Sequence, residues 1–202
     1  MYFLFYIIIT KMEICLKLFD PIKTKNDVYF SKITNNDSEF TFQLEKTGVK
    51  LGKENCKAKV LLKGHEIETI RIVAEEVIKK TSENSERWFG KSISEEDCRS
   101  IYKDAVVDSV LHCFFDENTI FFSSNKELSV DDLDEDITGI TLLNCMGVVY
   151  TKTSFFLRFE INQFKLKSEK KNQEYLIKDL EEHNQCLEDE KIIKKIEEIT
   201  LF

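Results

Sequence analysis

Alternating apolar and polar side chains in two neighbouring segments constrain the fold of this 202-residue chain more than any other feature. Residues 140–150 and 154–166 have the composition of two long strands, and residues 151–153 between them can form a hairpin turn. Successive side chains of a strand point to opposite faces of a sheet. One face of the second strand is wholly apolar and carries Phe155, Leu157, Phe159 and Ile161. The chain is therefore expected to fold around an antiparallel β-sheet.

The remaining strand signals are shorter. Near residues 162–163 the apolar positions shift to Phe164 and Leu166, which predicts a β-bulge. Further strands are predicted at residues 14–19, 28–33, 40–44, 58–62, 111–115 and 119–122. The turn-forming residues 35–38 predict a hairpin between the second and third of these, and Gly48 and Gly52 are expected to flank a loop.

Two helices interrupt the strand pattern. From residue 67 to residue 81 apolar side chains recur every three or four positions, which indicates an amphipathic helix. Ser94, followed by three acidic residues, predicts the start of a second helix that runs to about residue 108. Residues 84–91 are expected to form a loop between the two helices. The chain is therefore predicted to be an α+β protein.

The two ends of the chain differ from its middle. Residues 1–9 are continuously apolar, but a bilayer span takes about twenty residues, and the basic start and cleavage site of a secretory signal are missing. We expect residues 1–11 to be an apolar leader, either untranslated because translation starts at Met12, or disordered. Residues 12–167 are expected to form the domain. We expect the protein to be neither secreted nor associated with a membrane.

Residues 168–202 are predicted to form a charged amphipathic helix. A heptad stripe runs along it through Leu176, Leu180, His183 and Leu187. This helix either packs on its own domain or forms a homotypic coiled coil.

The net charge of −8 disfavours indiscriminate binding to polyanions, but the charges are segregated along the chain. Residues 116–136 contain eight acidic residues and one lysine, whereas residues 150–171 contain six basic residues and two acidic ones. A local basic surface is therefore compatible with the acidic total.

No motif for catalysis or cofactor binding is present. The sequence contains no glycine-rich phosphate loop, no G-x-S-x-G elbow and no H-E-x-x-H pair. Its six cysteines and three histidines lack the close spacing of zinc ligands, and the acidic residues 131–136 lack the spacing of a calcium loop. We expect reduced thiols, no metal, no cofactor and no enzymatic activity.

Two segments instead interleave aromatic rings with cations, as a surface that stacks bases and contacts phosphates requires. The first is residues 84–91, around Trp88, and the second is residues 155–167. A lone tryptophan between two amphipathic helices equally well fills a core, and a lysine-bearing strand is equally well a solvated face.

These segments resemble a family of single-stranded DNA-binding proteins of nucleocytoplasmic large DNA viruses, of phycodnavirus, mimivirus and asfarvirus type. The family segment N-S-x-x-W-F-x-K-x-x-S is similar to residues 84–94, and its G-x-x-F…F-G-L-x-W-x-x-x-Q-x-K segment is similar to residues 147–165. This chain departs from it at Phe156, where the family has Gly, and at Phe159, where it has Trp. It also has no Pro in residues 43–52.

The resemblance implies an OB-like antiparallel β-barrel with inserted helices. It also implies sequence-independent binding of single-stranded DNA in viral DNA replication, recombination or repair, at a replication site in the host cytoplasm or in the nucleus. Expected to stack on bases are Trp88, Phe89 and Tyr150. Expected to contact phosphates are Arg87, Lys91, Lys152, Arg158, Lys165 and Lys167.

The alternative is a protein-interaction or virion structural module that has the fold without DNA binding. Such a module would self-associate, or bind a replication protein, through residues 172–200. The residues do not distinguish DNA from RNA.

Overall fold

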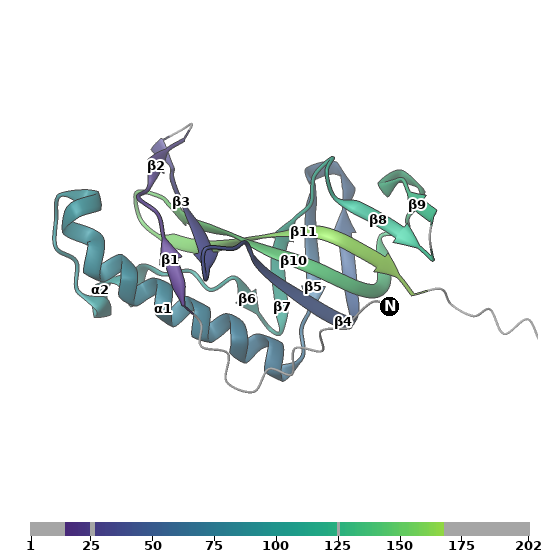
Figure 1. The fold of residues 1–202 in the computed structure, drawn as a ribbon, viewed down its shortest axis with the longest axis horizontal. Helices are drawn as coiled ribbons and strands as arrows, with labels where there is room; N and C mark the ends of the chain where they lie inside the picture. The colour runs from purple at the N-terminus through teal and green to yellow at the C-terminus, as the bar shows by residue number, and fades with distance from the viewer. Residues whose placement is uncertain (1–14, 25–26, 125, 168–202) are drawn as a thin grey trace, which may run out of the picture. The chain divides into compact units, whose positions relative to one another are not determined.

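The computed structural model describes residues 15–24, 27–124 and 126–167 and shows an α+β fold (Figure 1). The strands are β1 (Leu16–Leu18), β2 (Ile22–Lys23), β3 (Tyr29–Asn35), β4 (Phe40–Gly52), β5 (Lys57–Leu61), β6 (Val106–Val107), β7 (Val110–Phe114), β8 (Ile120–Ser123), β9 (Lys126–Leu128), β10 (Asp136–Tyr150) and β11 (Phe155–Leu166). The helices are α1 (Gly64–Phe89) and α2 (Glu95–Ile101), with short 3-10 turns η2 (Lys53–Asn55) and η3 (Val130–Asp132). The predicted ends of the chain, residues 1–11 and 168–202, lie outside the described residues.

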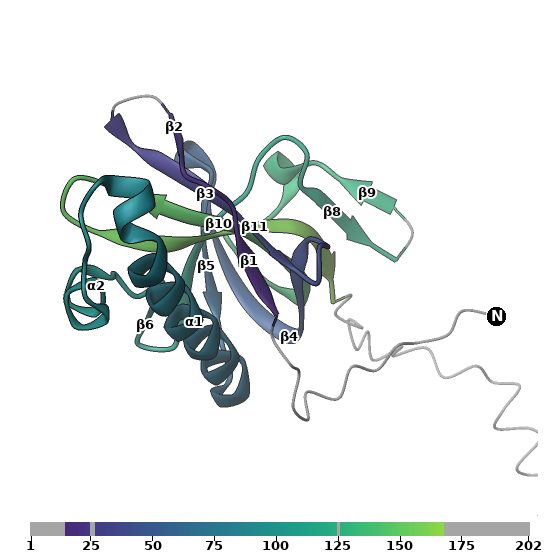
Figure 2. The ribbon, with the colours of Figure 1, turned by 60° about the vertical axis from the view of Figure 1, so that its left-hand side comes forward.

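Five of the strands close into a barrel. Around it the order is β10–β4–β5–β7–β11, and β11 pairs with β10 again. All of these pairs are antiparallel except β7 with β11. Numbered along the chain, the five strands follow the order 1-2-3-5-4-1, the topology of an OB-fold, so the expected OB-like barrel is confirmed. The hairpin of β8 and β9 stands beside it, on the side away from α1 (Figure 2).

The hairpin of β10 and β11 agrees closely with the sequence prediction. The four alternate residues from Phe155 to Ile161 are buried, and their neighbours face outward. Leu142 pairs with Gln163 and Leu143 with Ile161, so Asn162 is the extra residue of a bulge. The bulge returns Phe164 to the core, which is why the apolar pattern shifts there.

β3 and β4 do not form the predicted hairpin. Both pair antiparallel with the same edge of β10, one after the other: Lys32 lies opposite Gly147, and Phe40 lies opposite Cys145. The turn at residues 35–38 is present, and Asn35 bridges to Ser38 across it. The end of β3 before this turn pairs with β1 instead of with β4. The long strand β10 offers one edge to both β3 and β4, and pairing with it buries both of them. The local turn signal therefore does not decide the pairing.

The predicted loop at Gly48 and Gly52 is also wrong. β4 continues through both glycines, because Gly48 pairs with Thr138 of β10 and Gly52 pairs with Lys57 of β5. Pairing on both edges of the strand outweighs the weak strand propensity of glycine.

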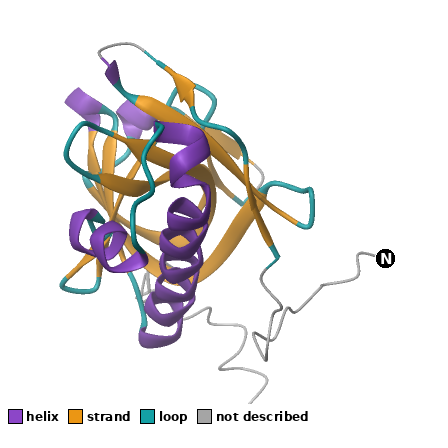
Figure 3. Ribbon diagram, turned by 90° about the vertical axis from the view of Figure 1, so that its left-hand side faces the viewer, coloured by secondary structure: helices purple, strands orange, loops and turns teal. Residues whose placement is uncertain are grey.

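α1 covers one side of the strands (Figure 3). Its buried face contains the predicted apolar residues Ile70, Val73, Ala74, Val77 and Ile78. The helix is longer than the sequence predicts, since it continues through residues 84–89 and ends where Gly90 adopts a left-handed conformation with φ 68°. The expected loop around Trp88 is therefore the last turns of α1.

α2 begins as predicted, since the Ser94 hydroxyl accepts a hydrogen bond from the Asp97 backbone N–H at 3.1 Å. It ends at Ile101 rather than near residue 108. There the chain becomes extended, because Tyr102 bridges to Phe155 and the Lys103 N–H donates to the Phe155 carbonyl. No helix in the described residues is long and apolar enough to cross a membrane.

Candidate nucleic-acid interface

The outer face of β5 and β7 places cations beside rings. Lys57 lies opposite Phe114, and Lys59 lies opposite His112. Residues directly opposite in an antiparallel pair project to the same face. The alternate residues on both strands are buried: Ala58, Val60, Leu111 and Cys113. Burial of one face thus forces the lysines and the rings together on the other.

A groove of about 700 Å³ follows this face. β4 adds Lys50, which pairs with Lys59, and the chain after α2 adds Lys103. We call this surface the lysine groove; it consists of Lys50, Lys57, Lys59, Lys103, His112 and Phe114. With Lys53 its lining contains five lysines, against the three acids Glu54, Asp104 and Glu135. The groove is therefore locally basic in a chain whose net charge is −8.

The cations of the groove differ in how they are engaged. The Lys53 ammonium donates to the backbone carbonyls of Leu133 and Asp131, which ties η2 to the acidic segment. Within the described part of the chain, the other four lysines make no ion pair. Their charges are available to an incoming anion.

Arg158 of β11 joins the edge of the groove. Its guanidinium carbon lies 4.6 Å from the centroid of the Phe114 ring, a cation–π contact. Glu160 lies opposite Phe114 in the β7–β11 pair. Burial, and then the charge of Asp116, raise the pKa of Glu160, while Arg158 acts in the opposite direction. A phosphate would meet a favourable and an unfavourable charge side by side here.

The predicted residues Arg87 and Trp88 make a common contact. The Trp88 indole N–H donates to Asp20 Oδ1 at 2.9 Å, and the Arg87 guanidinium donates to the same oxygen. Trp88 is partly buried and packs on the core. Its indole nitrogen therefore anchors the C-terminal end of α1 to the chain between β1 and β2.

Tyr150 lies in the core, with only 5% of its surface exposed. Its hydroxyl lies 3.0 Å from the Thr81 hydroxyl, and its ring stacks on Phe155 with centroids 5.5 Å apart. Burial raises the pKa of the Tyr150 hydroxyl. The structure thus leaves this ring no open face for a base, in contrast to Phe89, which is partly exposed.

The other predicted cations are spread over the surface. Lys152 lies in the β10–β11 turn, 3.5 Å from Asp27, and Lys91 is exposed just after α1. Lys165 and Lys167 are exposed near the opposite end of β11, roughly 30 Å away at ~3.3 Å per residue. The predicted residues thus fall into separate groups, and Arg158 is the one at the lysine groove.

Sequence reasoning missed the lysine groove itself. The alternation of residues 57–61 and 110–114 is visible in the sequence and separates each strand into a buried and an open face. That the two open faces adjoin follows only from the pairing of β5 with β7.

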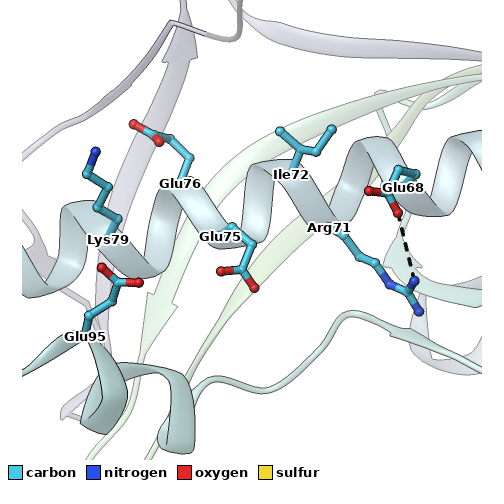
Figure 4. A pocket seen from close by; sticks show the side chains of 7 residues that line it. All are labelled: Glu68, Arg71, Ile72, Glu75, Glu76, Lys79 and Glu95. Atoms are coloured by element: carbon cyan, nitrogen blue, oxygen red, sulfur yellow. Dashed lines mark ion pairs between the residues drawn. The ribbon is translucent and has the colours of Figure 1, made fainter.

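A second hollow, of about 430 Å³, lies on the exposed face of α1 (Figure 4). Its lining contains Glu68, Glu75, Glu76 and Glu95, with Arg71, Lys79 and Ile72. The four carboxylates outnumber the two cations, and Arg71 is 4.0 Å from Glu68. This hollow therefore disfavours phosphate.

Three of the thiols in the described residues lie in the hydrophobic core. Cys98, Cys113 and Cys145 are buried, and burial raises the pKa of Cys113 to about 12. Within the described ranges, no three His, Cys, Asp or Glu side chains gather as metal ligands would.

The chain was compared with solved structures, with curated proteins and with protein-family models. A solved structure described as "Single-stranded DNA-binding protein from bacteriophage Enc34 in complex with ssDNA" is similar with a TM-score of 0.41 and 11% identity, covering 73% of this chain and 94% of that chain. No curated protein matches. A family model described as "Family of unknown function (DUF5871)" matches residues 47–180, which is more than half of the chain and includes β5 to β11. The chain therefore belongs to this family, DUF5871.

Proposed function

We propose that this protein binds single-stranded nucleic acid in the lysine groove. The observation that carries the proposal is the set of four lysines without ion pairs among the described residues, arranged around Phe114 and His112 on the β5–β7 face. In OB-folds the face of the second and third strands is a common site for oligonucleotides. In this chain those strands are β5 and β7.

A single strand fits this surface better than a duplex does. Lysines contact phosphates without regard to sequence, whereas rings need bases that are free to stack. Phe114 and Phe156 are both partly exposed in the groove. Stacking contributes about 1–3 kcal/mol per base and tolerates every base. Binding would therefore be independent of sequence.

The biological setting is proposed from the sequence resemblance. The similarity of residues 84–94 and 147–165 to viral single-stranded DNA-binding proteins supports DNA as the ligand. It also supports a role in viral DNA replication, recombination or repair, in the host cytoplasm or nucleus.

The test is a titration of labelled oligo-dT at two salt concentrations. If the four lysines contact four phosphates, log K should fall with log salt with a slope of roughly −3, at about −0.7 per phosphate of a single strand. The double variant Lys57→Glu/Lys59→Glu should weaken binding at low salt by at least about tenfold. The control Lys79→Glu/Lys126→Glu changes the net charge equally, outside the groove, and should bind like the wild type. Absence of binding at low salt, or an equal loss in both variants, would overturn the proposal.

Self-association is the second candidate function, and the heptad stripe at residues 176–187 favours it. This segment lies outside the described residues. Sedimentation of the chain truncated after Lys167 separates the two functions. Loss of self-association with oligo-dT binding intact supports nucleic-acid binding by the barrel, whereas loss of both supports a module that acts through residues 172–200.

A further inference from the structure

A second aromatic surface lies outside the lysine groove, at the C-terminal end of α1. Tyr29 and Phe89 are each 37% exposed. Both lie beside the buried Tyr150: the Phe89 centroid is 5.4 Å from the Tyr150 centroid, and Tyr29 is directly opposite Tyr150 in the β3–β10 pair. Opposite residues of an antiparallel pair share a face. The two open rings therefore flank one enclosed ring.

Three cations are neighbours of these aromatic residues: Lys23 lies opposite Tyr29 in the β2–β3 pair, Arg87 precedes Phe89 by two residues, and Lys152 follows Tyr150 by two. Each is paired with an exposed carboxylate. Arg87 pairs with Asp20, and both Lys152 and Lys23 pair with Asp27. Exposed ion pairs of this kind stabilise a protein by about 0–1 kcal/mol. A phosphate can therefore replace the carboxylate at little cost. We call Tyr29, Phe89, Arg87 and Lys152 the aromatic end.

The aromatic end and the lysine groove meet at the tip of the β10–β11 hairpin. Phe155 and Phe156 follow each other in β11 and project to opposite faces; Phe155 stacks on Tyr150, and Phe156 lines the groove. The backbone N–H of Lys103, another groove residue, donates to the Phe155 carbonyl at 2.8 Å. Lys152 of the aromatic end lies in the turn of this hairpin, with its side chain 80% exposed.

We propose that a strand bound in the lysine groove continues around the β10–β11 turn to the aromatic end. There its bases contact Tyr29 and Phe89, and its phosphates replace Asp20 and Asp27 at Arg87 and Lys152. This inference rests on the proposed function, because it adds a second segment to the same ligand path. It predicts that a short oligonucleotide fills the groove alone and that only a longer one reaches both segments.

The only tryptophan of the chain reports on the second segment. The Trp88 ring is 6.2 Å from the Phe89 ring, so its emission should change when bases reach the aromatic end. The experiment titrates the full-length protein with oligo-dT of about 5 and about 15 nucleotides, near the limits of site size for an OB-fold. Both should bind, as followed by anisotropy of an end label. Only the longer one should change the emission of Trp88.

Variants then separate the two segments. Tyr29→Ala/Phe89→Ala should weaken binding of the longer oligonucleotide by about tenfold and leave the shorter one unchanged. Lys152→Glu, at a highly exposed position, should act in the same direction without removing packing. The control Ile140→Ala removes a side chain of similar exposure, 38%, and should bind both lengths like the wild type.

The outcomes distinguish this inference from the proposed function. If both lengths bind equally well, without a change in Trp88 emission and without an effect of the variants, the groove stands and the aromatic end is not part of the path. The same conclusion follows if the variants weaken both lengths equally. If neither length binds at low salt, the proposed function and this inference both fall.

Discussion

Gly147 is the residue on which the junction of three strands depends. Its backbone φ is +152°. Gly147 pairs with Lys32 of β3 on one edge of β10 and with Arg158 of β11 on the other, directly after a bulge in β10. A Cβ at this position would overlap the carbonyl oxygen of Ser31, a backbone atom that cannot rotate away. Only glycine lets β3 approach β10 here.

Gly147→Ala is therefore expected to lower the free energy of unfolding by at least about 2 kcal/mol, as overpacking with backbone displacement does. Urea denaturation followed by circular dichroism measures this change. Gly48→Ala is the matched control, because no atom lies within 4 Å of its added Cβ. A loss at position 48 as large as that at position 147 would contradict the steric argument.

Glu160 is expected to make stability depend on pH. Burial and Asp116 raise its pKa in the folded protein, so the native state favours the protonated carboxyl. The resulting stabilisation is fully present below the unfolded pKa of about 4.3 and is lost as pH rises through the raised native pKa. Glu160→Gln should therefore be more stable than the wild type at neutral pH, with the difference disappearing in acid.

Unfolding free energies of both proteins across this pH range test the effect. A difference that does not vary with pH would refute the assignment. At neutral pH the same substitution should strengthen oligo-dT binding, because it removes a negative charge beside Arg158 and Phe114.

At the scale of elements, α1 is tied at its C-terminal end to the segment between β1 and β2. Asp20, between β1 and β2, accepts hydrogen bonds from Arg87 and Trp88 in the last turn of the helix. The Ser85 hydroxyl donates to the Ser82 carbonyl and accepts from the Ile93 N–H, which holds the chain after the helix. The polar residues of segment 84–91, which suggested a loop, thus make contacts at the end of a helix.

Asp20→Ala should destabilise the protein by about 1 kcal/mol, the usual contribution of a hydrogen bond, reduced by exposure to solvent. It should also shift the Trp88 emission of the unliganded protein, because the indole N–H loses its partner. Glu68→Ala serves as the control, since Glu68 pairs with Arg71 alone in an exposed position of α1, where alanine suits the backbone. An unchanged emission spectrum in Asp20→Ala would contradict the contact.

The elements also show which local signals are sufficient. The cap at Ser94 and the buried face of α1 depend on residues within a few positions, and both were predictable. The length of α1, the early end of α2 and the course of β4 depend on partners far along the chain.

At the scale of the whole molecule, the core protects three of the thiols in the described residues. Cys15 and Cys56 are exposed, whereas Cys98, Cys113 and Cys145 are buried, and burial raises the pKa of all three buried thiols. A thiol reagent should therefore modify Cys15 and Cys56 in the native protein within minutes. The three buried thiols should react only after unfolding in urea. Mass spectrometry of peptides maps the sites, and rapid native labelling of Cys145 would contradict the closed barrel.

The charge of the molecule is arranged on the same scale. Lysines gather where β4, β5 and β7 adjoin, and carboxylates gather on the open face of α1. The net charge of −8 is thus compatible with a basic groove, although the groove lysines lie outside the basic segment 150–171 that the sequence singled out.

The α+β class, the two faces of β11, its bulge at Asn162 and the buried stripe of α1 are all predictable from the amino-acid sequence. These features follow from periods of two or of three to four residues, which the backbone imposes locally. Two further features emerge only when the chain is folded: β3 and β4 share an edge of β10, and Lys57 and Lys59 lie beside Phe114 and His112. Strand pairing is chosen by burial between residues distant in sequence, and no local period encodes it.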